Sequence, residues 1–212
     1  RQKSSKTLYK DWFYQWHSTI SPERVSDVVR LKYRRFGEMY LLPYIGNIYV
    51  EDLDTEDLRK LVDFTWPTIV NSDGSPRLSQ SARINVYKVL QMTLREAVRT
   101  KRINVTQSAL EGVKPPRREK KILSLGDKIG KTKGLINWMI ENEHPDYCRI
   151  LFQWLGLRRS ERLGLQWSSI KNLNGKNPKI VISHQLARHA DGSGYYLKKP
   201  KTESSIREIP LA

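Results

Sequence analysis

The segment 151–167 constrains the fold most, because it predicts two helices joined by a turn that holds an arginine in place. Apolar residues recur at helical spacing up to Leu155, and Gly156 is the residue type that ends a helix in a left-handed conformation. Ser160 is expected to cap the second helix. The turn between the two helices then presents the side chain of Arg158.

An arginine fixed in such a turn can point several hydrogen-bond donors at one phosphate, whereas a freely moving surface arginine stays solvated. Glu161 follows three residues later, and we expect its carboxylate to hold the guanidinium of Arg158 from behind. The alternative is an ordinary surface ion pair, which contributes little to stability. Taken alone, the turn leaves both interpretations open.

Two motifs in this order resemble those of the tyrosine recombinases, the phage-integrase family. Residues 156–161, Gly-Leu-Arg-Arg-Ser-Glu, and residues 165–168, Leu-Gln-Trp-Ser, are similar to the family's first catalytic-arginine motif. Residues 200–211 are similar to the hairpin that carries the family's catalytic lysine, which corresponds to Lys201. Two motifs in the expected order make the resemblance more specific than either motif alone.

The resemblance implies an enzyme that cleaves and rejoins DNA without a metal ion or other cofactor. In the family, a tyrosine attacks the scissile phosphate and forms a 3′-phosphotyrosyl link. By resemblance, Arg158 stabilises charge on the phosphoryl group with the support of Glu161, and Lys201 protonates the departing 5′ oxygen. The other interpretation of Lys201 is a solvated turn lysine. The resemblance also implies a homotetramer on recombining sites and an accessory protein that sets the direction of recombination.

The remaining family motifs are absent from this sequence. A His-x-x-Arg motif and the nucleophilic tyrosine are expected after the lysine, and residues 202–212 contain neither. Tyr195 and Tyr196 precede Lys201, so we interpret them as strand residues. We therefore expect a fragment of a longer recombinase that binds DNA without cutting it. The alternative is a non-catalytic architectural or regulatory DNA-binding protein on the same scaffold.

Composition favours a polyanionic partner. The 212 residues carry a formal net charge of +16, and each phosphate that a protein neutralises releases condensed counterions. Double-stranded DNA is the partner that we expect, and RNA is the alternative that charge and tryptophans leave open. Cys148 is the single cysteine and excludes an internal disulfide, while four scattered histidines form no metal-ligand cluster. The lack of a long apolar run argues against a membrane span and predicts a cytoplasmic, nucleoid-associated protein.

Residues 1–113 predict a helical DNA-binding domain of four to five helices, which resembles the core-binding (SAM-like) domain of the family. Helices are expected to begin near Thr7, Ser21, Asp54 or Thr55, and Ser79. The last helix is the longest and carries a basic stripe, for which the alternative is a merely solvated face. The residues of this domain that we expect to contact DNA are Lys88, Arg95, Arg99, Arg34 and Arg35.

Residues 114–121 have the composition of a basic interdomain linker, with two prolines among closely spaced cations. The candidate DNA contacts of the linker are Lys114, Arg117 and Arg118. Residues 122–212 resemble the N-terminal part of the family's catalytic domain, with helices followed by a small antiparallel three-stranded sheet. Strands 195–199 and 205–211 are expected to pair around residues 202–204. The chain is therefore predicted to be mainly α, with a helical domain followed by a mixed α+β fragment.

Overall fold

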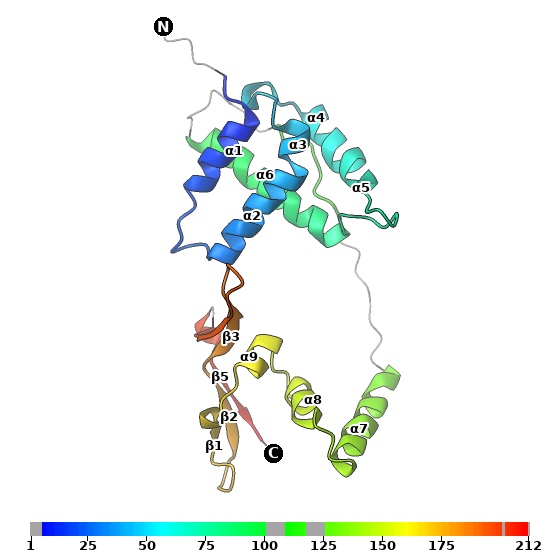
Figure 1. Ribbon diagram of the computed structural model, residues 1–212, viewed down its shortest axis with the longest axis vertical. Coiled ribbons are helices and arrows are strands. Elements are labelled where there is room, and N and C mark those ends of the chain that lie inside the picture. Colours follow the sequence, from blue (N-terminus) through cyan, green and yellow to red (C-terminus); the bar gives the residue numbers. More distant parts are fainter. Residues whose placement is uncertain (1–5, 101–108, 118–125, 201, 212) are drawn as a thin grey trace. The chain divides into compact units, whose positions relative to one another are not determined.

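The chain divides into two units, each described by itself (Figure 1). The residues that the computed structural model describes are 6–100, 109–117, 126–200 and 202–211. Only the backbone is described at 126–129. Unit 1 spans Arg1–Lys121 and unit 2 spans Ile122–Ala212. The prediction of a mainly α chain, with a helical region followed by a small three-stranded antiparallel sheet, is confirmed.

Helices account for the regular structure described in unit 1. Their bounds are α1 Tyr9–Ser18, α2 Asp27–Tyr40, α3 Leu42–Ile45, α4 Thr55–Arg59, α5 Trp66–Thr68 and α6 Gln80–Thr100. A 3₁₀ turn, Val50–Asp52, precedes α4, and a π-helical turn, Lys60–Thr65, joins α4 to α5. The long basic helix of the sequence analysis is therefore α6.

The predicted helix starts are confirmed at Asp54 and at Ser79. Each side chain accepts a hydrogen bond from the backbone N–H three residues later, at 2.8 Å and 3.2 Å respectively, as an N-cap does. The start predicted at Ser21 is wrong. The carbonyl oxygen of Ser21 accepts hydrogen bonds from the N–H groups of Arg24 and Val25 in a turn, and α2 begins only after Ser26. Thr7 was also predicted to cap a helix, but α1 begins at Tyr9 with no side-chain cap.

The core of unit 1 is built on aromatic side chains. Trp12 and Phe13 of α1 are buried, so the apolar side of this helix faces the core. Gly37 of α2 is required for this packing, because a Cβ at that position would overlap the ring of Phe13. The polar group at the centre is Thr93 of α6, whose hydroxyl lies 2.8 Å from the hydroxyl of Tyr9. Its carbonyl oxygen accepts a 3.0 Å hydrogen bond from the Trp12 indole, so the polar atoms of these three side chains are paired.

Unit 2 combines short helices with two antiparallel sheets. The bounds of its helices are α7 Gly126–Glu141, α8 Tyr147–Trp154 and α9 Arg159–Leu163. The bounds of its strands are β1 Ile170–Lys171, β2 Lys179–Ile182, β3 Gln185–Arg188, β4 Tyr195–Lys198 and β5 Arg207–Pro210. One sheet has the strand order β1-β2-β5, and β3 pairs with β4 in a separate two-stranded sheet.

The predicted pairing of 195–199 with 205–211 is wrong. β4 pairs with β3, with Leu186 opposite Leu197, and β5 pairs with β2, with Ile180 opposite Ile209. A 3₁₀ turn, η4, spans Glu203–Ser205 on the connection between the two sheets. Alternation predicts a strand and its inner face but leaves its partner open, and Ile209 packs against the buried Ile180 and its neighbours on β2.

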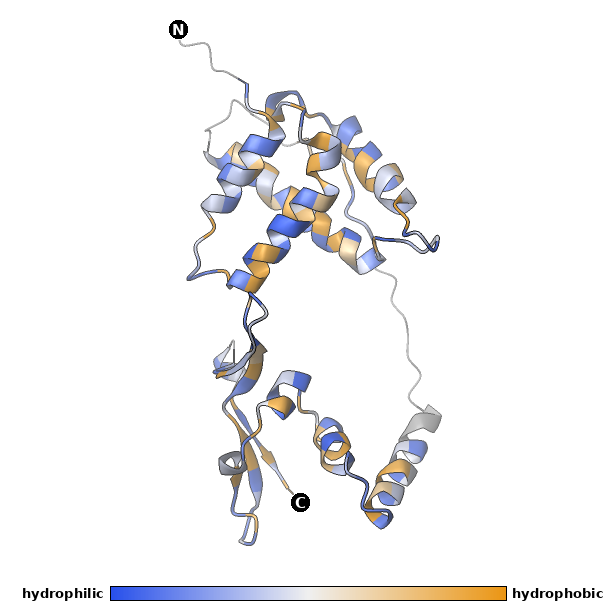
Figure 2. Ribbon diagram, in the orientation of Figure 1, coloured by the Kyte–Doolittle hydropathy of each residue, from blue (hydrophilic) through white to orange (hydrophobic). Residues whose placement is uncertain are grey.

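Hydropathy is mixed along every helix in Figure 2. Within the described ranges, helices long and apolar enough to cross a membrane do not occur.

In unit 2 the cluster of buried apolar side chains consists of Leu157, Ile180 and Ile182. These residues flank α9 and line β2, so the packed part of unit 2 surrounds the turn that carries Arg158.

Candidate active site

The turn between α8 and α9 is fixed by backbone hydrogen bonds. Gly156 has φ +81°, a conformation that glycine adopts without a Cβ penalty. Its N–H donates to the carbonyl oxygen of Gln153 at 3.0 Å, and the N–H of Leu157 donates to that of Phe152 at 3.1 Å. This is the Schellman arrangement, and it confirms the prediction that Gly156 ends the helix.

The N-cap of α9 is Arg158, in an extended conformation. Its backbone N–H donates to Glu161 Oε2 at 2.8 Å, which is the half of a capping box that a glutamate at the third helical position provides. Ser160 was predicted to cap this helix, and that prediction is wrong. Ser160 is the second residue of α9, and its hydroxyl donates to the side-chain oxygen of Gln185 on β3, at 3.2 Å.

The guanidinium of Arg158 is held on one side and open on the other. Its Nη1 donates to Glu161 Oε1 at 2.9 Å and to Ser205 Oγ at 3.2 Å. The side chain is nevertheless 64% exposed, so donors remain accessible to a ligand. The contact expected between Glu161 and Arg158 is therefore present.

Glu161 is a buried carboxylate shared by two arginines. Its side chain is 2% exposed, and Arg207 of β5 donates to both of its oxygens, at 3.0 Å from Nη1 and 2.9 Å from Nη2. Each carboxylate oxygen thus accepts two hydrogen bonds, which satisfies its lone pairs. The bonds from Arg207 lower the pKa of Glu161 to about 2, with a further contribution from Arg158 and against the effect of burial.

Arg207 was missed by the sequence analysis. Its side chain also donates to the carbonyl oxygens of Gly156, at 3.3 Å, and Ser205, at 3.4 Å. A signal was available, because Arg207 and Ile209 are two residues apart and so lie on the same face of β5, the less exposed one. A cation on the inward face of a strand requires a buried partner, and the partner is Glu161.

Lys201 lies outside the described residues. The residues that follow it approach Arg158. Thr202 Oγ1 lies 2.9 Å from Ser205 Oγ and 3.1 Å from Ser204 Oγ, and Ser205 in turn contacts Arg158. A row of hydroxyl groups therefore extends from the guanidinium to the residue after Lys201.

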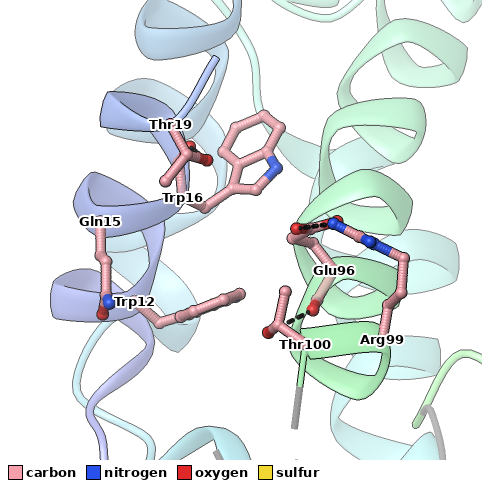
Figure 3. A pocket seen from close by; sticks show the side chains of 7 residues that line it. All are labelled: Trp12, Gln15, Trp16, Thr19, Glu96, Arg99 and Thr100. Atoms are coloured by element: carbon pink, nitrogen blue, oxygen red, sulfur yellow. Dashed lines mark hydrogen bonds and ion pairs between the residues drawn. The ribbon is translucent and has the colours of Figure 1, made fainter. Parts of the chain in front are cut away.

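The predicted DNA contacts of unit 1 are exposed but differ in how their charges are compensated. Arg118 lies outside the described residues, and the exposed members of the set are Lys88, Arg95, Arg99, Arg34, Arg35, Lys114 and Arg117. Arg34 donates to Glu38 at 2.9 Å. Arg99 donates twice to Glu96, at 2.6 Å and 2.8 Å, and lines a pocket with Trp12 and Trp16 (Figure 3).

The two tyrosines that precede Lys201 are residues of β4, as interpreted from the sequence. Both are exposed, and the ring of Tyr196 lies 4.5 Å from that of His189. Within the described ranges, groups of His, Cys, Asp and Glu that could together hold a metal ion do not occur.

Known protein structures share this fold. Neither a protein-family model nor a curated protein matches the chain. The Tn1549 transposon integrase, solved in complex with transposon right end DNA, superposes with a TM-score of 0.69 at 20% identity, over 97% of this chain and 61% of that one. A lambda integrase tetramer bound to a Holliday junction gives a TM-score of 0.55 at 11% identity, over 91% of this chain and 51% of that one. The chain therefore matches the tyrosine recombinase fold over most of its length, and it spans about three fifths of the transposon integrase chain.

Proposed function

We propose that this chain is the part of a site-specific tyrosine recombinase that binds DNA and carries the first catalytic arginine. The observation that carries the proposal is the exposed guanidinium of Arg158, fixed on the buried carboxylate of Glu161. A preorganised donor of this kind stabilises negative charge on a phosphoryl group. The net charge of +16 and the fold shared with integrases solved on DNA support double-stranded DNA as the substrate.

In this proposal the units have separate tasks. Residues 1–113 form a core-binding domain, residues 114–121 a linker along the DNA, and residues 122–212 the first part of a catalytic domain. The cations of α2, α6 and the linker contact backbone phosphates, which supplies affinity without sequence information. Recombination proceeds on a homotetramer with an accessory protein that sets its direction.

The proposed reaction is phosphoryl transfer to a tyrosine that lies beyond this sequence. The tyrosine hydroxyl loses its proton to solvent and its oxygen forms a bond to phosphorus while the bond to the 5′ oxygen breaks. Lys201 gives the departing 5′ oxygen a proton. Arg158 stabilises the charge on the non-bridging oxygens. One phosphodiester replaces another, so the step is reversible without a cofactor.

The test is cleavage of a nicked suicide DNA substrate by the full-length protein. We expect Arg158→Ala to reduce the yield of covalent protein–DNA complex by ~10²–10³-fold while leaving DNA affinity nearly unchanged. Arg159→Ala is the matched control, because its side chain is exposed next to Arg158 in the sequence. Wild-type yield from Arg158→Ala would contradict the assignment, and an inactive wild-type protein that binds DNA would support the architectural alternative.

Lys201 is tested by changing the leaving group. We expect Lys201→Ala to abolish cleavage of an ordinary substrate and to recover it on a substrate with sulfur at the bridging 5′ position, because a thiolate leaves without a proton. Arg158→Ala gains no such recovery. Equal behaviour of the two variants on both substrates would remove Lys201 from the role of general acid.

A further inference from the structure

The net charge of the pair formed by Arg158 and Glu161 affects how strongly Arg158 can attract a phosphate. A carboxylate in contact with a single guanidinium neutralises it, and a neutral pair attracts a phosphate much less than a free cation does. Arg158 would then be well oriented but weakly attractive to an anion. The second guanidinium at Glu161 changes this balance.

Arg207 makes more side-chain hydrogen bonds to the carboxylate of Glu161 than Arg158 does. Its guanidinium makes two parallel hydrogen bonds to the oxygens of Glu161, a bidentate geometry that is stronger and more specific than a single contact. The guanidinium of Arg158 makes one hydrogen bond to the same carboxylate. The three groups together carry a net charge of +1, and the exposed member of the three is Arg158, whereas the Arg207 side chain is 30% exposed.

Arg207 also holds the backbone around Arg158. Its Nη2 donates at 3.3 Å to the carbonyl oxygen of Gly156, two residues before Arg158, and its Nη1 approaches that of Ser205 at 3.4 Å. Ser205 itself contacts Arg158 through its hydroxyl. One side chain from β5 therefore joins the turn, the carboxylate and the hydroxyl that surround the exposed guanidinium.

We propose that Arg207 is a positioning residue that neutralises Glu161 and so leaves the charge of Arg158 available to a DNA phosphate. The inference rests on the proposed function, because it explains how the site there would attract the scissile phosphate. It assigns Arg207 no contact with the substrate. It also distinguishes two roles of Glu161, which orients Arg158 and would compete with the phosphate if Arg207 were absent.

The decisive comparison is between single and double variants of the full-length protein on the suicide substrate. We expect Arg207→Gln to lower the yield of covalent complex ~10–100-fold, as loss of a supporting partner does. Adding Glu161→Gln to it restores the net charge of +1 and recovers a substantial part of that loss. A merely structural role predicts that the double variant is at least as impaired as the single one, and that outcome overturns the proposal.

The pH dependence gives a second readout. The charged groups that the described residues bring against Glu161 are Arg158 from the start of α9 and Arg207 from β5. Glu161 also accepts a hydrogen bond from the backbone N–H of Arg158. Removing Arg207 raises the pKa of Glu161, because its main stabilising partner is lost. The yield of Arg207→Gln relative to wild type should therefore increase as pH falls toward the raised pKa, because protonation removes the negative charge of Glu161. A constant ratio overturns the charge-neutralising role.

The matched control is Lys179→Gln. It removes one positive charge from the same sheet, where the partly exposed side chain of Lys179 forms an ion pair with Glu208 of β5. We expect its yield to stay within about twofold of wild type, since exposed pairs contribute little. A loss equal to that of Arg207→Gln would show that net charge of the sheet, and not neutralisation of Glu161, is responsible.

A carboxyl NMR titration of the 212-residue chain separates failure of this inference from failure of the proposed function. We expect the Glu161 resonance to titrate at a clearly higher pH in Arg207→Gln than in wild type, whether or not the full-length protein cleaves DNA. An unchanged titration overturns the inference even if Arg158→Ala abolishes cleavage. Thermal unfolding of the same samples shows whether Arg207→Gln folds. If it does not fold, Arg207→Lys is titrated in its place, and the expected rise in the Glu161 pKa is smaller because the positive charge is kept.

Discussion

Units 1 and 2 are stabilised in different ways. Unit 1 encloses one large apolar cluster in which Trp12 and Trp66 are almost completely covered. The corresponding cluster of unit 2 is small and lies around the turn before α9. Apolar side chains of α7 and α8, among them Trp138 and Trp154, remain about half exposed, and both helices include strongly hydrophobic residues in Figure 2.

The two units also differ in the charge of their buried polar side chains. Among the described residues of unit 1, the fully buried polar side chain is the neutral Thr93, which bonds to a tyrosine hydroxyl and a backbone carbonyl. In unit 2 it is the charged Glu161 between two arginines. Buried ion pairs contribute little net stability but fix geometry strongly when their hydrogen bonds are complete. The interior of unit 1 therefore stabilises a scaffold, whereas that of unit 2 holds one exposed guanidinium in place.

Two tryptophans test whether stability is concentrated in unit 1. Trp66 is completely buried and its indole N–H donates to a backbone carbonyl at 3.1 Å, whereas Trp167 in unit 2 is 87% exposed. We expect Trp66→Ala to lower the free energy of unfolding, measured by urea denaturation of the 212-residue chain, by about 3–5 kcal/mol. Trp167→Ala should change it by less than about 0.5 kcal/mol. Similar losses in both variants would contradict the contrast between the units.

Local rules made much of unit 1 and the turn of unit 2 predictable. Asp54, Ser79 and Gly156 were identified because capping depends on a few neighbouring residues, and each is confirmed by a backbone hydrogen bond. The start of α2 was missed because both Ser21 and Ser26 are suitable caps, and the choice between them depends on packing elsewhere. Sequence reasoning was therefore reliable where a single turn of chain decides the outcome.

Contacts between distant segments could not be derived in the same way. The alternation around Arg207 predicts a strand and its inner face, but it does not say that β2 and not β4 is the partner. The hydrogen bonds from Arg207 to Glu161 join residues 46 positions apart. The proximity of Glu161 to Arg158 was foreseen because residues three positions apart in a helical turn lie close together. The second partner of Glu161, Arg207, was not foreseen.

Acid should weaken unit 2 through Glu161. Its pKa is lowered from 4.5 to about 2 in the folded chain, so its contribution to stability is complete above about pH 4.5 and disappears as pH falls toward 2. The contribution is roughly 2–3 kcal/mol, and amide hydrogen exchange in α9 and β5 between pH 5 and pH 2 measures it. Glu161→Gln should remove this pH dependence. The amides of α6 provide the comparison, because the buried polar residue of that helix, Thr93, has no charge to lose in acid. Equal acid sensitivity in the variant would show that other carboxylates are responsible.

The smallest expected effect concerns affinity, which we assign to the cations of unit 1. Arg95 and Arg99 are both exposed and four residues apart on α6, but Arg99 shares its charge with Glu96 while Arg95 makes no ion pair within the described part of the chain. We expect Arg95→Ala to reduce the slope of log affinity against log salt by about 0.9, the value for one phosphate contact on duplex DNA. Arg99→Ala should reduce it less, because a guanidinium already neutralised by a carboxylate releases fewer counterions. Fluorescence anisotropy with a labelled duplex from 50 to 200 mM salt measures both slopes, and an unchanged slope for Arg95→Ala would remove α6 from the DNA interface.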